Sequence, residues 1–177
     1  MIASTRTSEF ETSARHRAPR SPRLPEFVEP GRSWASSPAT RRVMLACRSR
    51  DTKPETAVRS IVHRMGLRYR VDARPVRGLR RTGDLVFTRA RVVVFIDGCF
   101  WHGCPLHFTA PRSNRDYWLE KAEYNRARDR NTDATLSADG WFVVRIWEHE
   151  APTDAASRIR DAVERKTSPG YAESTDG

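Results

Sequence analysis

The sequence predicts a mixed α/β fold in which helices cover both faces of a central sheet. Three observations lead to this prediction: helical and strand periodicities alternate along the chain, several short apolar runs have strand-like composition, and one run, residues 92–96, is apolar throughout. A strand that is apolar throughout is typical of the centre of a sheet, where both faces are buried. With 177 residues, the chain suits one domain with terminal extensions.

Four segments are expected to form strands. Residues 67–71 alternate apolar with basic side chains, which is the pattern of a half-buried strand. Residues 84–87 and 91–97 are predicted to form a hairpin, and residues 141–147 to form a further buried strand.

Three segments are expected to form helices. The first begins at Thr52, which is a good N-cap residue, and ends at Gly66. The second, residues 113–139, opens on a capping-box pattern and stops before Gly140. The third, residues 153–166, carries its apolar side chains on one face. The predicted order is helix, three strands, long helix, strand and helix.

The two ends of the chain are expected to lie outside the folded domain. Residues 1–40 are rich in Ser, Thr, Arg and Pro without an apolar period, so they are predicted to form a disordered basic arm. Contact with DNA and plain solvation are both open as interpretations of this arm. The folded domain is expected at residues 41–166, and a disordered tail at residues 167–177.

Composition narrows the classes of partner and compartment. The chain carries 32 Lys and Arg residues against 22 Asp and Glu residues, a formal net charge of +10 that favours a nucleic-acid partner. No stretch approaches the ~18 apolar residues of a membrane-spanning helix and no secretory signal is visible, so we expect a cytoplasmic protein without a membrane partner. Three cysteines, an odd number, argue against a disulfide framework and favour a metal or catalytic role.

Cysteines and histidines crowd into the segment that follows the predicted central strand. Cys99, Cys104 and His107 have the spacing C-x4-C-x2-H, and His149 follows the last predicted strand. Thiolate and imidazole suit Zn²⁺, which takes about four ligands in structural sites. We therefore expect a structural zinc site that joins the ends of two strands. His102 lies between the cysteines, and spacing alone leaves it as a competing ligand.

Carboxylates flank the predicted hairpin. Asp84 opens one strand and Asp97 ends the next, and such a pair could hold Mg²⁺, which prefers oxygen ligands. With His102 as a proton acceptor or donor and Glu55 as a further carboxylate, these residues would form a site for metal-assisted phosphodiester hydrolysis. An aspartate before a strand is also a common turn residue, so spacing alone leaves both interpretations open.

Aromatic residues lie beside basic ones. Phe100 and Trp101 follow a cysteine of the predicted zinc site, and aromatic side chains on a rigid loop can wedge between base pairs. Trp118 and Lys121 are three residues apart on a predicted helix and share a face, which continues with Arg128. For any one of these residues core packing or solvation is the better interpretation, but the group beside the predicted zinc loop favours DNA contact.

These segments together resemble the very-short-patch mismatch-repair DNA endonucleases. The resemblance covers roughly residues 41–150 and is most specific in the stretch Gly-Cys-Phe-Trp-His-Gly-Cys-Pro that begins at Gly98. The other matching segments are 51–55, 84–87, 93–97, 117–121, 125–129 and 140–148.

The resemblance implies a restriction-endonuclease-like core and a Mg²⁺-dependent nick in duplex DNA. The nick would fall on the 5′ side of the thymine in a T·G mismatch, which arises when 5-methylcytosine deaminates. The resemblance also implies a bacterial, nucleoid-associated monomer, with other mismatch-repair proteins as further partners.

The resemblance also assigns roles to residues. It implies Asp84 as the catalytic Mg²⁺-binding aspartate, His102 as the catalytic histidine, and Glu55 as a glutamate acting through metal-bound water. The implied zinc ligands are Cys99, Cys104, His107 and His149. The implied DNA contacts are the intercalating Phe100, Trp101 and Trp118, with Lys121, Asn125 and Arg128 beside them.

Three positions depart from the family pattern. The run before Asp84 is Arg-Arg-Thr-Gly instead of Pro-Gly-Arg-Pro. Ile96-Asp97 stands where some members carry Thr-His; the main-chain carbonyl of Ile96 can still bind Mg²⁺, and Asp97 would act as a direct or water-mediated ligand. His149 stands where cysteine is also found. Two alternatives remain open: a catalytically impaired zinc-containing DNA-binding module, and a restriction-type nuclease of the same fold with another substrate.

Overall fold

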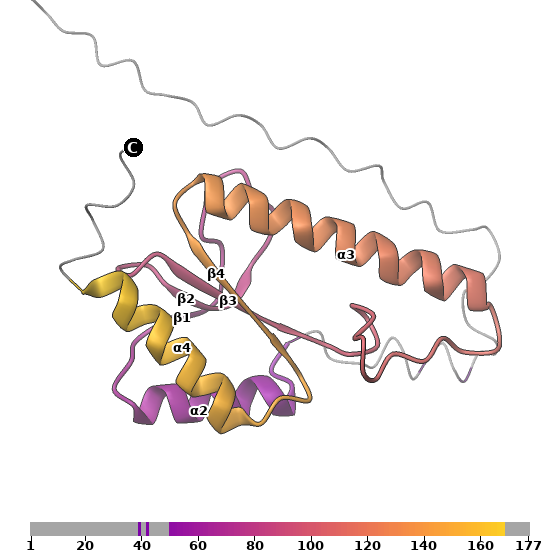
Figure 1. The fold of residues 1–177 in the computed structure, drawn as a ribbon, viewed down its shortest axis with the longest axis horizontal. Coiled ribbons are helices and arrows are strands. Elements are labelled where there is room, and N and C mark those ends of the chain that lie inside the picture. Colours follow the sequence, from indigo (N-terminus) through magenta and orange to yellow (C-terminus); the bar gives the residue numbers. More distant parts are fainter. Residues whose placement is uncertain (1–38, 40–41, 43–49, 169–177) are drawn as a thin grey trace, which may run out of the picture.

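A computed structural model describes Ala39, Arg42 and residues 50–168. In this part of the chain a four-stranded sheet is covered on one face by helices α2 (Lys53–Arg64) and α4 (Pro152–Thr167), and on the other by the long helix α3 (Arg115–Ala138) (Figure 1). The predicted α/β class, with helices on both faces, is confirmed. Apart from Ala39, Thr167 and Ser168, the predicted arm and tail lie outside the described residues, and Thr167 is the last residue of α4.

The sheet has the strand order β1 (Arg70–Ala73), β2 (Gly83–Phe87), β3 (Val92–Asp97) and β4 (Phe142–Trp147). The first three strands pair antiparallel, which includes the predicted hairpin, whereas β3 and β4 pair parallel. The carboxyl ends of β3 and β4 therefore meet the amino end of β2 at one edge of the sheet. The chemistry-bearing segments identified from the sequence follow these strand ends.

The central strand is buried on both faces, as its apolar run predicts. Val92 and Val94 pack into a core with α2 and α4, and Val93 packs into a second core with α3. All three valines are fully shielded from solvent. Each buried valine contributes about 1.5–3 kcal/mol relative to exposure, so β3 is a rigid support for the loop that follows it.

Two predicted boundaries are wrong by a few residues. The strand predicted at 67–71 forms at Arg70–Ala73, because Leu67 and Tyr69 are half-buried against the α2 core before pairing begins. The alternation of apolar and basic residues at 67–70 reflects which side chains are buried and does not indicate strand pairing. The capping box predicted at the start of 113–139 is replaced by an N-cap at Asn114, whose φ of 56° is left-handed and which makes no side-chain capping hydrogen bond. Asparagine tolerates this conformation better than most residues.

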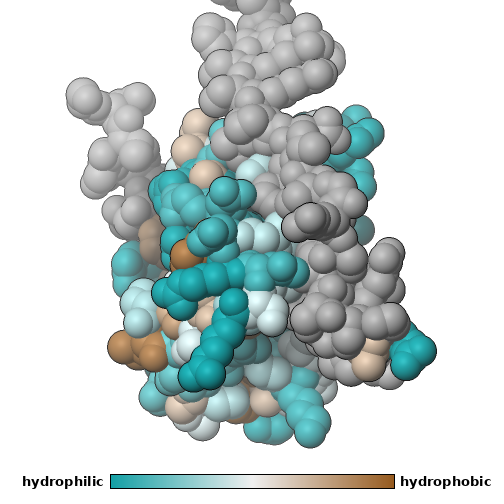
Figure 2. Space-filling view, turned by 90° about the vertical axis from the view of Figure 1, so that its right-hand side faces the viewer, coloured by the Kyte–Doolittle hydropathy of each residue, from teal (hydrophilic) through white to brown (hydrophobic). Residues whose placement is uncertain are grey.

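The described helices include none that is both long enough and apolar enough to cross a membrane. Figure 2 looks onto the side of the molecule at which α3 begins. Outside the grey atoms this side is mainly hydrophilic, with small scattered hydrophobic patches.

Candidate active site and metal centre

Four sulfur and nitrogen ligands converge where β3 and β4 end. The Cys99 sulfur lies 3.1 Å from Nδ1 of His149, and Nδ1 of His107 lies 3.9 and 3.7 Å from the sulfurs of Cys99 and Cys104. A tetrahedral zinc with bonds of about 2.3 Å to sulfur and 2.0 Å to nitrogen separates such ligands by about 3.6 Å. The donor types and their spacing therefore fit Zn²⁺. The two thiols are buried and the two imidazoles are exposed.

The loop that carries both cysteines folds on itself. The Cys104 amide donates to the Cys99 carbonyl at 2.9 Å, and the backbone between them turns at Gly103, whose φ is 64°. This positive φ favours glycine, whereas the 2.5 Å approach of a Cβ to Nη1 of Arg126 could be relieved by movement of that flexible side chain. The Cys99 amide donates to the carboxylate of Glu148 at 2.6 Å, which joins the loop to the end of β4.

The raised pKa of Cys99 indicates that its thiolate is unfavourable in this loop without a nearby cation. Burial, the neighbouring Cys104 thiol and the Glu148 carboxylate together raise the pKa of Cys99 to about 11. Two thiolates are therefore unfavourable in this loop unless a positive charge lies between them. A metal ion supplies that charge, which agrees with the fit of the four ligands to zinc.

His102 is not part of this cluster. Its Nδ1 lies 2.5 Å from a carboxylate oxygen of Asp129 on α3 and 3.6 Å from Asp97. These three residues form the second group among the described residues whose ligand atoms converge. The structure therefore separates the two histidines of the loop, with His107 beside the cysteines and His102 beside carboxylates. Although burial alone would raise it, the hydrogen bond from His102 and the charge of Arg145 hold the pKa of Asp129 below its usual value.

Asp84 lies on the other side of the central strand end. Its carboxylate accepts a hydrogen bond from the Ile96 amide at 2.7 Å, so Asp84 and the Ile96 backbone are adjacent, as the predicted Mg²⁺ site requires. Burial raises the pKa of Asp84 to about 6, although the Ile96 hydrogen bond opposes this, and the nearby Glu55 and Asp97 carboxylates add to the increase. Oxygen ligands of this kind fit Mg²⁺, which would also relieve the repulsion between the carboxylates.

Glu55 is buried at the start of α2. Its carboxylate accepts hydrogen bonds from the Asp51 amide and from the Thr52 hydroxyl, both at 2.8 Å. These contacts close the amino end of the helix and fix the position of the carboxylate. The capping role and the predicted catalytic role are compatible, and the catalytic role stays a prediction.

Asp97 has a partner that the sequence did not suggest. Both of its oxygens accept hydrogen bonds from Nη1 of Arg145 on β4, at 2.8 and 2.9 Å. Burial raises the pKa of Asp97, although the charge of Arg145 opposes this. The described geometry thus pairs Asp97 with an arginine, and its binding to a metal stays a prediction.

The predicted DNA-contacting aromatics form one cluster. The Phe100 ring lies 5.3 Å from that of Trp101 and 5.1 Å from that of Trp118, between ring centroids. Trp118 is 6% exposed, whereas Trp101 is 37% exposed. Trp101 is therefore the member that can reach a partner without rearrangement, while the buried Trp118 ring packs against it.

The remaining predicted DNA contacts lie along α3. Asn125 is buried and donates to the Trp101 carbonyl at 2.6 Å, so in this structure it holds the loop. The Lys121 ammonium lies 5.9 Å from the Tyr124 ring centroid. Arg128 is partly exposed next to Asp129. Contact of these residues with DNA stays a prediction.

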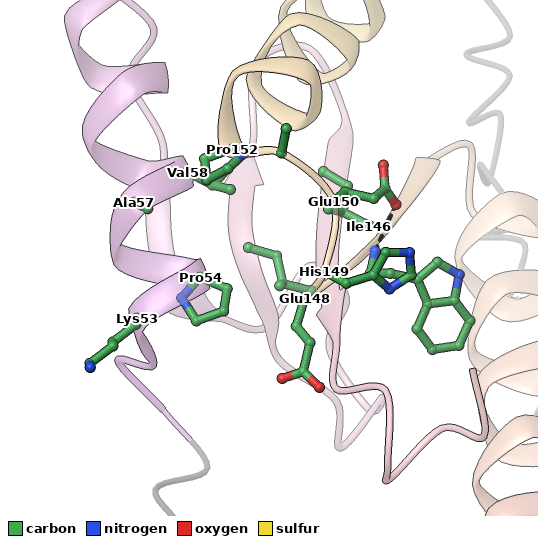
Figure 3. A pocket seen from close by; sticks show the side chains of 12 residues that line it. Lys53, Pro54, Ala57, Val58, Ile146, Glu148, His149, Glu150 and Pro152 are labelled. Atoms are coloured by element: carbon green, nitrogen blue, oxygen red, sulfur yellow. Dashed lines mark hydrogen bonds between the residues drawn. The ribbon is translucent and has the colours of Figure 1, made fainter. Parts of the chain in front are cut away.

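A pocket of about 370 Å³ lies outside this group, between the start of α2 and the turn after β4. Lys53 and Pro54 form one wall, and Glu148 and His149 lie on the other (Figure 3). Neither Asp84 nor His102 lines the pocket. The pocket touches the Cys/His cluster through His149 and the proposed Mg²⁺ site through Ile96, whereas Asp97 and Asp129 do not line it.

Sequence reasoning gave no role to Asp129, Arg145 or Glu148. Asp129 fell within a segment that carried the resemblance, which was the one available signal for it. Arg145 interrupts an otherwise apolar strand, and a charge at such a position indicates a buried partner. Arg145 and Glu148 also fell within such a segment, residues 140–148, but no spacing distinguished Glu148 from other acidic residues in turns.

Comparison with known proteins agrees with this geometry. A family model described as DNA mismatch endonuclease Vsr matches residues 35–107. The chain is 42% identical over 153 residues to the type II nicking enzyme V.NaeI of Lentzea aerocolonigenes, covering 85% of this chain and 87% of that protein. It is 45% identical over 117 residues to the type II nicking enzyme V.XorIIP of Xanthomonas oryzae pv. oryzae, covering 64% and 83%. It is 38% identical over 107 residues to the DNA mismatch endonuclease Vsr of Escherichia coli K12, covering 59% and 66%.

Proposed function

This chain belongs to the Vsr family of DNA endonucleases, and we propose that it nicks duplex DNA on the 5′ side of the thymine in a T·G mismatch, with Mg²⁺ at Asp84. That the chain is a DNA-nicking endonuclease follows from the family and from relatives named as nicking enzymes. One observation carries the finer proposal. The Asp84–Ile96 contact and the His102–Asp129 pair lie at one sheet edge, next to the loop that exposes Trp101.

The metal proposal is supported by the donor atoms at this edge. The Asp84 carboxylate and the main-chain carbonyl of Ile96 would hold Mg²⁺, because both are oxygen ligands on a buried strand end. When bound, the ion stabilises charge on the phosphate and lowers the pKa of the attacking water. Because the pKa of Asp84 is about 6, its carboxylate is ionised and available as a ligand at neutral pH.

The proton-transfer proposal is supported by the orientation of His102. Its Nδ1 is engaged by Asp129, so Nε2 is the ring atom left for the attacking water or the leaving oxygen. The carboxylate fixes the ring orientation in the way that a general acid or base requires. Glu55, held by two hydrogen bonds at the start of α2, would orient metal-bound water.

The Cys/His cluster would hold Zn²⁺ as a structural ion. The four residues would supply the four ligands that a structural zinc site uses, which would leave no coordination position for substrate. The ion would fix the loop between β3 and α3, and with it the orientations of His102 and Trp101. Zinc would therefore affect the reaction only indirectly, by fixing the positions of these side chains.

Mismatch recognition is proposed to rest on the aromatic cluster. Trp101 would insert at the mismatch, with Phe100 and Trp118 behind it, and Lys121, Asn125 and Arg128 would contact the surrounding DNA. A mismatched step is easier to unstack than a paired one, so insertion favours the mismatch. The formal net charge of +10 supports the phosphate contacts.

A second candidate is nicking at another mismatch or sequence context. The names of two relatives call them type II nicking enzymes and mention no mismatch, which favours testing substrates beyond T·G. The E. coli relative is named a mismatch endonuclease, and the loop with exposed Trp101 supports the mismatch proposal.

The test is nicking of labelled duplexes that differ at one base pair, T·G or T·A, in several flanking sequences. We expect Mg²⁺-dependent cleavage 5′ to the mismatched thymine and none at T·A. Asp84→Asn should abolish cleavage, while Asp161→Asn, an exposed aspartate on α4, should leave it unchanged. Equal nicking of T·G and T·A duplexes would overturn the mismatch proposal.

A further inference from the structure

Arg145 lies at the centre of a partly buried ionic network beside His102. Its guanidinium donates to Asp97 through Nη1 and to Asp133 through Nε and Nη2, with distances from 2.8 to 3.1 Å. Nη2 also lies 3.5 Å from the Asp129 carboxylate. The same Asp129 carboxylate holds Nδ1 of His102 at 2.5 Å through its other oxygen. One arginine therefore connects β4 with the end of β3 and with α3.

The network places three carboxylates around one cation. The side chain of Asp97 is 9% exposed and that of Asp129 is 16% exposed, so water can do little to screen their repulsion. Asp97, His102 and Asp129 could otherwise gather around a metal ion. The guanidinium already engages both Asp97 oxygens, so it supplies the positive charge that a metal would bring to this group.

The shape of the guanidinium matters as much as its charge. Arginine presents its donors in a rigid planar fork, and here different edges of the fork meet different aspartates. The plane is also packed on Phe95, with 4.8 Å between the guanidinium carbon and the ring centroid. A lysine ammonium at this position could neutralise the carboxylates but could not donate to Asp97 and Asp133 in two fixed directions while lying beside Asp129.

Because the proposed function gives His102 the proton transfer, we propose that Arg145 is a positioning residue: it fixes Asp129 against Asp97, and Asp129 in turn orients the His102 ring toward the scissile phosphate. This inference rests on the proposed function of His102. It also gives Asp97 a role next to the site, as the second anchor of the arginine instead of a metal ligand.

The test compares three variants of the full chain. Arg145→Met removes the charge and keeps a side chain that can pack on Phe95, and Arg145→Lys keeps the charge without the fork. Arg91→Met is the matched control, because Arg91 also packs on a ring, that of Trp141, and pairs with an aspartate, Asp139, at the opposite end of β3. Each protein is examined for thermal unfolding, zinc content, binding to the T·G duplex, single-turnover nicking, and the hydrogen-bonded Nδ1 proton of His102 in ¹⁵N-histidine-labelled protein.

For Arg145→Met we expect loss of the His102 proton signal and a nicking rate at least about 30-fold lower, with DNA affinity and zinc content within about threefold of the parent. Arg145→Lys should recover part of the rate, and Arg91→Met all of it. If Arg145→Met fails to fold, the lysine variant alone decides, because it should still show a weakened signal and an intermediate rate.

The positioning role is overturned if folded Arg145 variants keep the His102 signal and nick within twofold of the parent. It is also overturned if DNA affinity falls as much as the rate, since Arg145 would then act by binding DNA. The proton signal requires no cleavage. A parent protein that does not nick T·G duplexes would contradict the proposed function, while the signal would still decide whether Arg145 orients His102.

Discussion

Two groups of side chains share the loop after β3 but differ in chemistry: the Cys/His cluster, and the carboxylate–histidine group formed by Asp97, His102 and Asp129. Cys99, Cys104 and His107 lie with His149 as a closed set of soft ligands. His102, three residues after Cys99, lies instead among carboxylates and Arg145. The loop directs His102 to one group and the residues on either side of it, Cys99 and Cys104, to the other.

The two regions differ in their expected effect on stability. With zinc bound, the Cys/His cluster would stabilise the fold and leave no coordination position for substrate, whereas buried carboxylates near one another cost stability. In the second region the pKa of Asp84 is about 6 and that of Asp97 is also raised, because both carboxylates are buried near others. Charges held at such a cost are typical of functional sites, although ion-pair networks also produce them.

The largest expected effect separates the two histidines of the loop. His102→Gln should lower the nicking rate about 10²–10⁴-fold, because it removes a general acid or base. Zinc content and thermal unfolding should remain those of the parent. A loss of zinc in this variant would break the distinction between the two regions.

A substitution in the Cys/His cluster should have the converse effect, on zinc content and stability. Cys104→Ser should lower zinc content below one per chain and lower the unfolding temperature by about 10 °C or more, which corresponds to several kcal/mol. Calorimetry and elemental analysis measure the two effects. Unchanged stability with zinc lost would show that the cluster does not hold the fold.

A smaller effect is expected on replacing Asp84, and here the free energy of unfolding should rise instead of fall. Its pKa in the folded protein is about 6, above the usual 3.8, so the folded state binds this proton more tightly than the unfolded state. Its contribution to stability is present below pH 4 and is lost as pH rises through about 6. Asp84→Asn should therefore stabilise the metal-free protein by up to about 3 kcal/mol at pH 8 and much less at pH 4.

Denaturant unfolding of both proteins at the two pH values measures this difference. Asp161→Asn is the control for the loss of one negative charge. An asparagine variant that is less stable than the parent at pH 8 would contradict the raised pKa of Asp84.

The smallest predicted effect concerns the exposed aromatic residue of the loop. Trp101→Ala should weaken binding to the T·G duplex by about 1–3 kcal/mol, the usual value of one stacked base. Leu106→Ala, which removes a 77% exposed apolar side chain from the same loop, should change binding little. Equal losses would mean that the loop contributes general apolar surface without stacking.

The sequence could predict the fold class because its signals are local. The apolar run at β3, the helix start at Thr52 and the stop at Gly66 depend on near neighbours, and all three are confirmed. The four cluster residues also had a readable spacing, and the structure brings them together.

The ionic partners of the site could not be predicted in the same way. His102 and Asp129 are 27 residues apart, and Asp97 and Arg145 are 48 apart. These contacts depend on how α3 packs across the sheet and on the parallel register of β3 and β4. No pattern of local spacing encodes either feature, and the same holds for the Glu148 contact with Cys99, 49 residues apart.

The most direct test of the separation between the two regions is brief treatment with EDTA, followed by measurement of zinc content, unfolding temperature and T·G nicking on the same sample. We expect nicking to disappear while about one zinc per chain and the unfolding temperature are retained, and Mg²⁺ alone to restore the full rate. If nicking instead follows the zinc content and returns only when Zn²⁺ is added, the cluster takes part in the chemistry and the assignment of separate structural and catalytic regions is wrong.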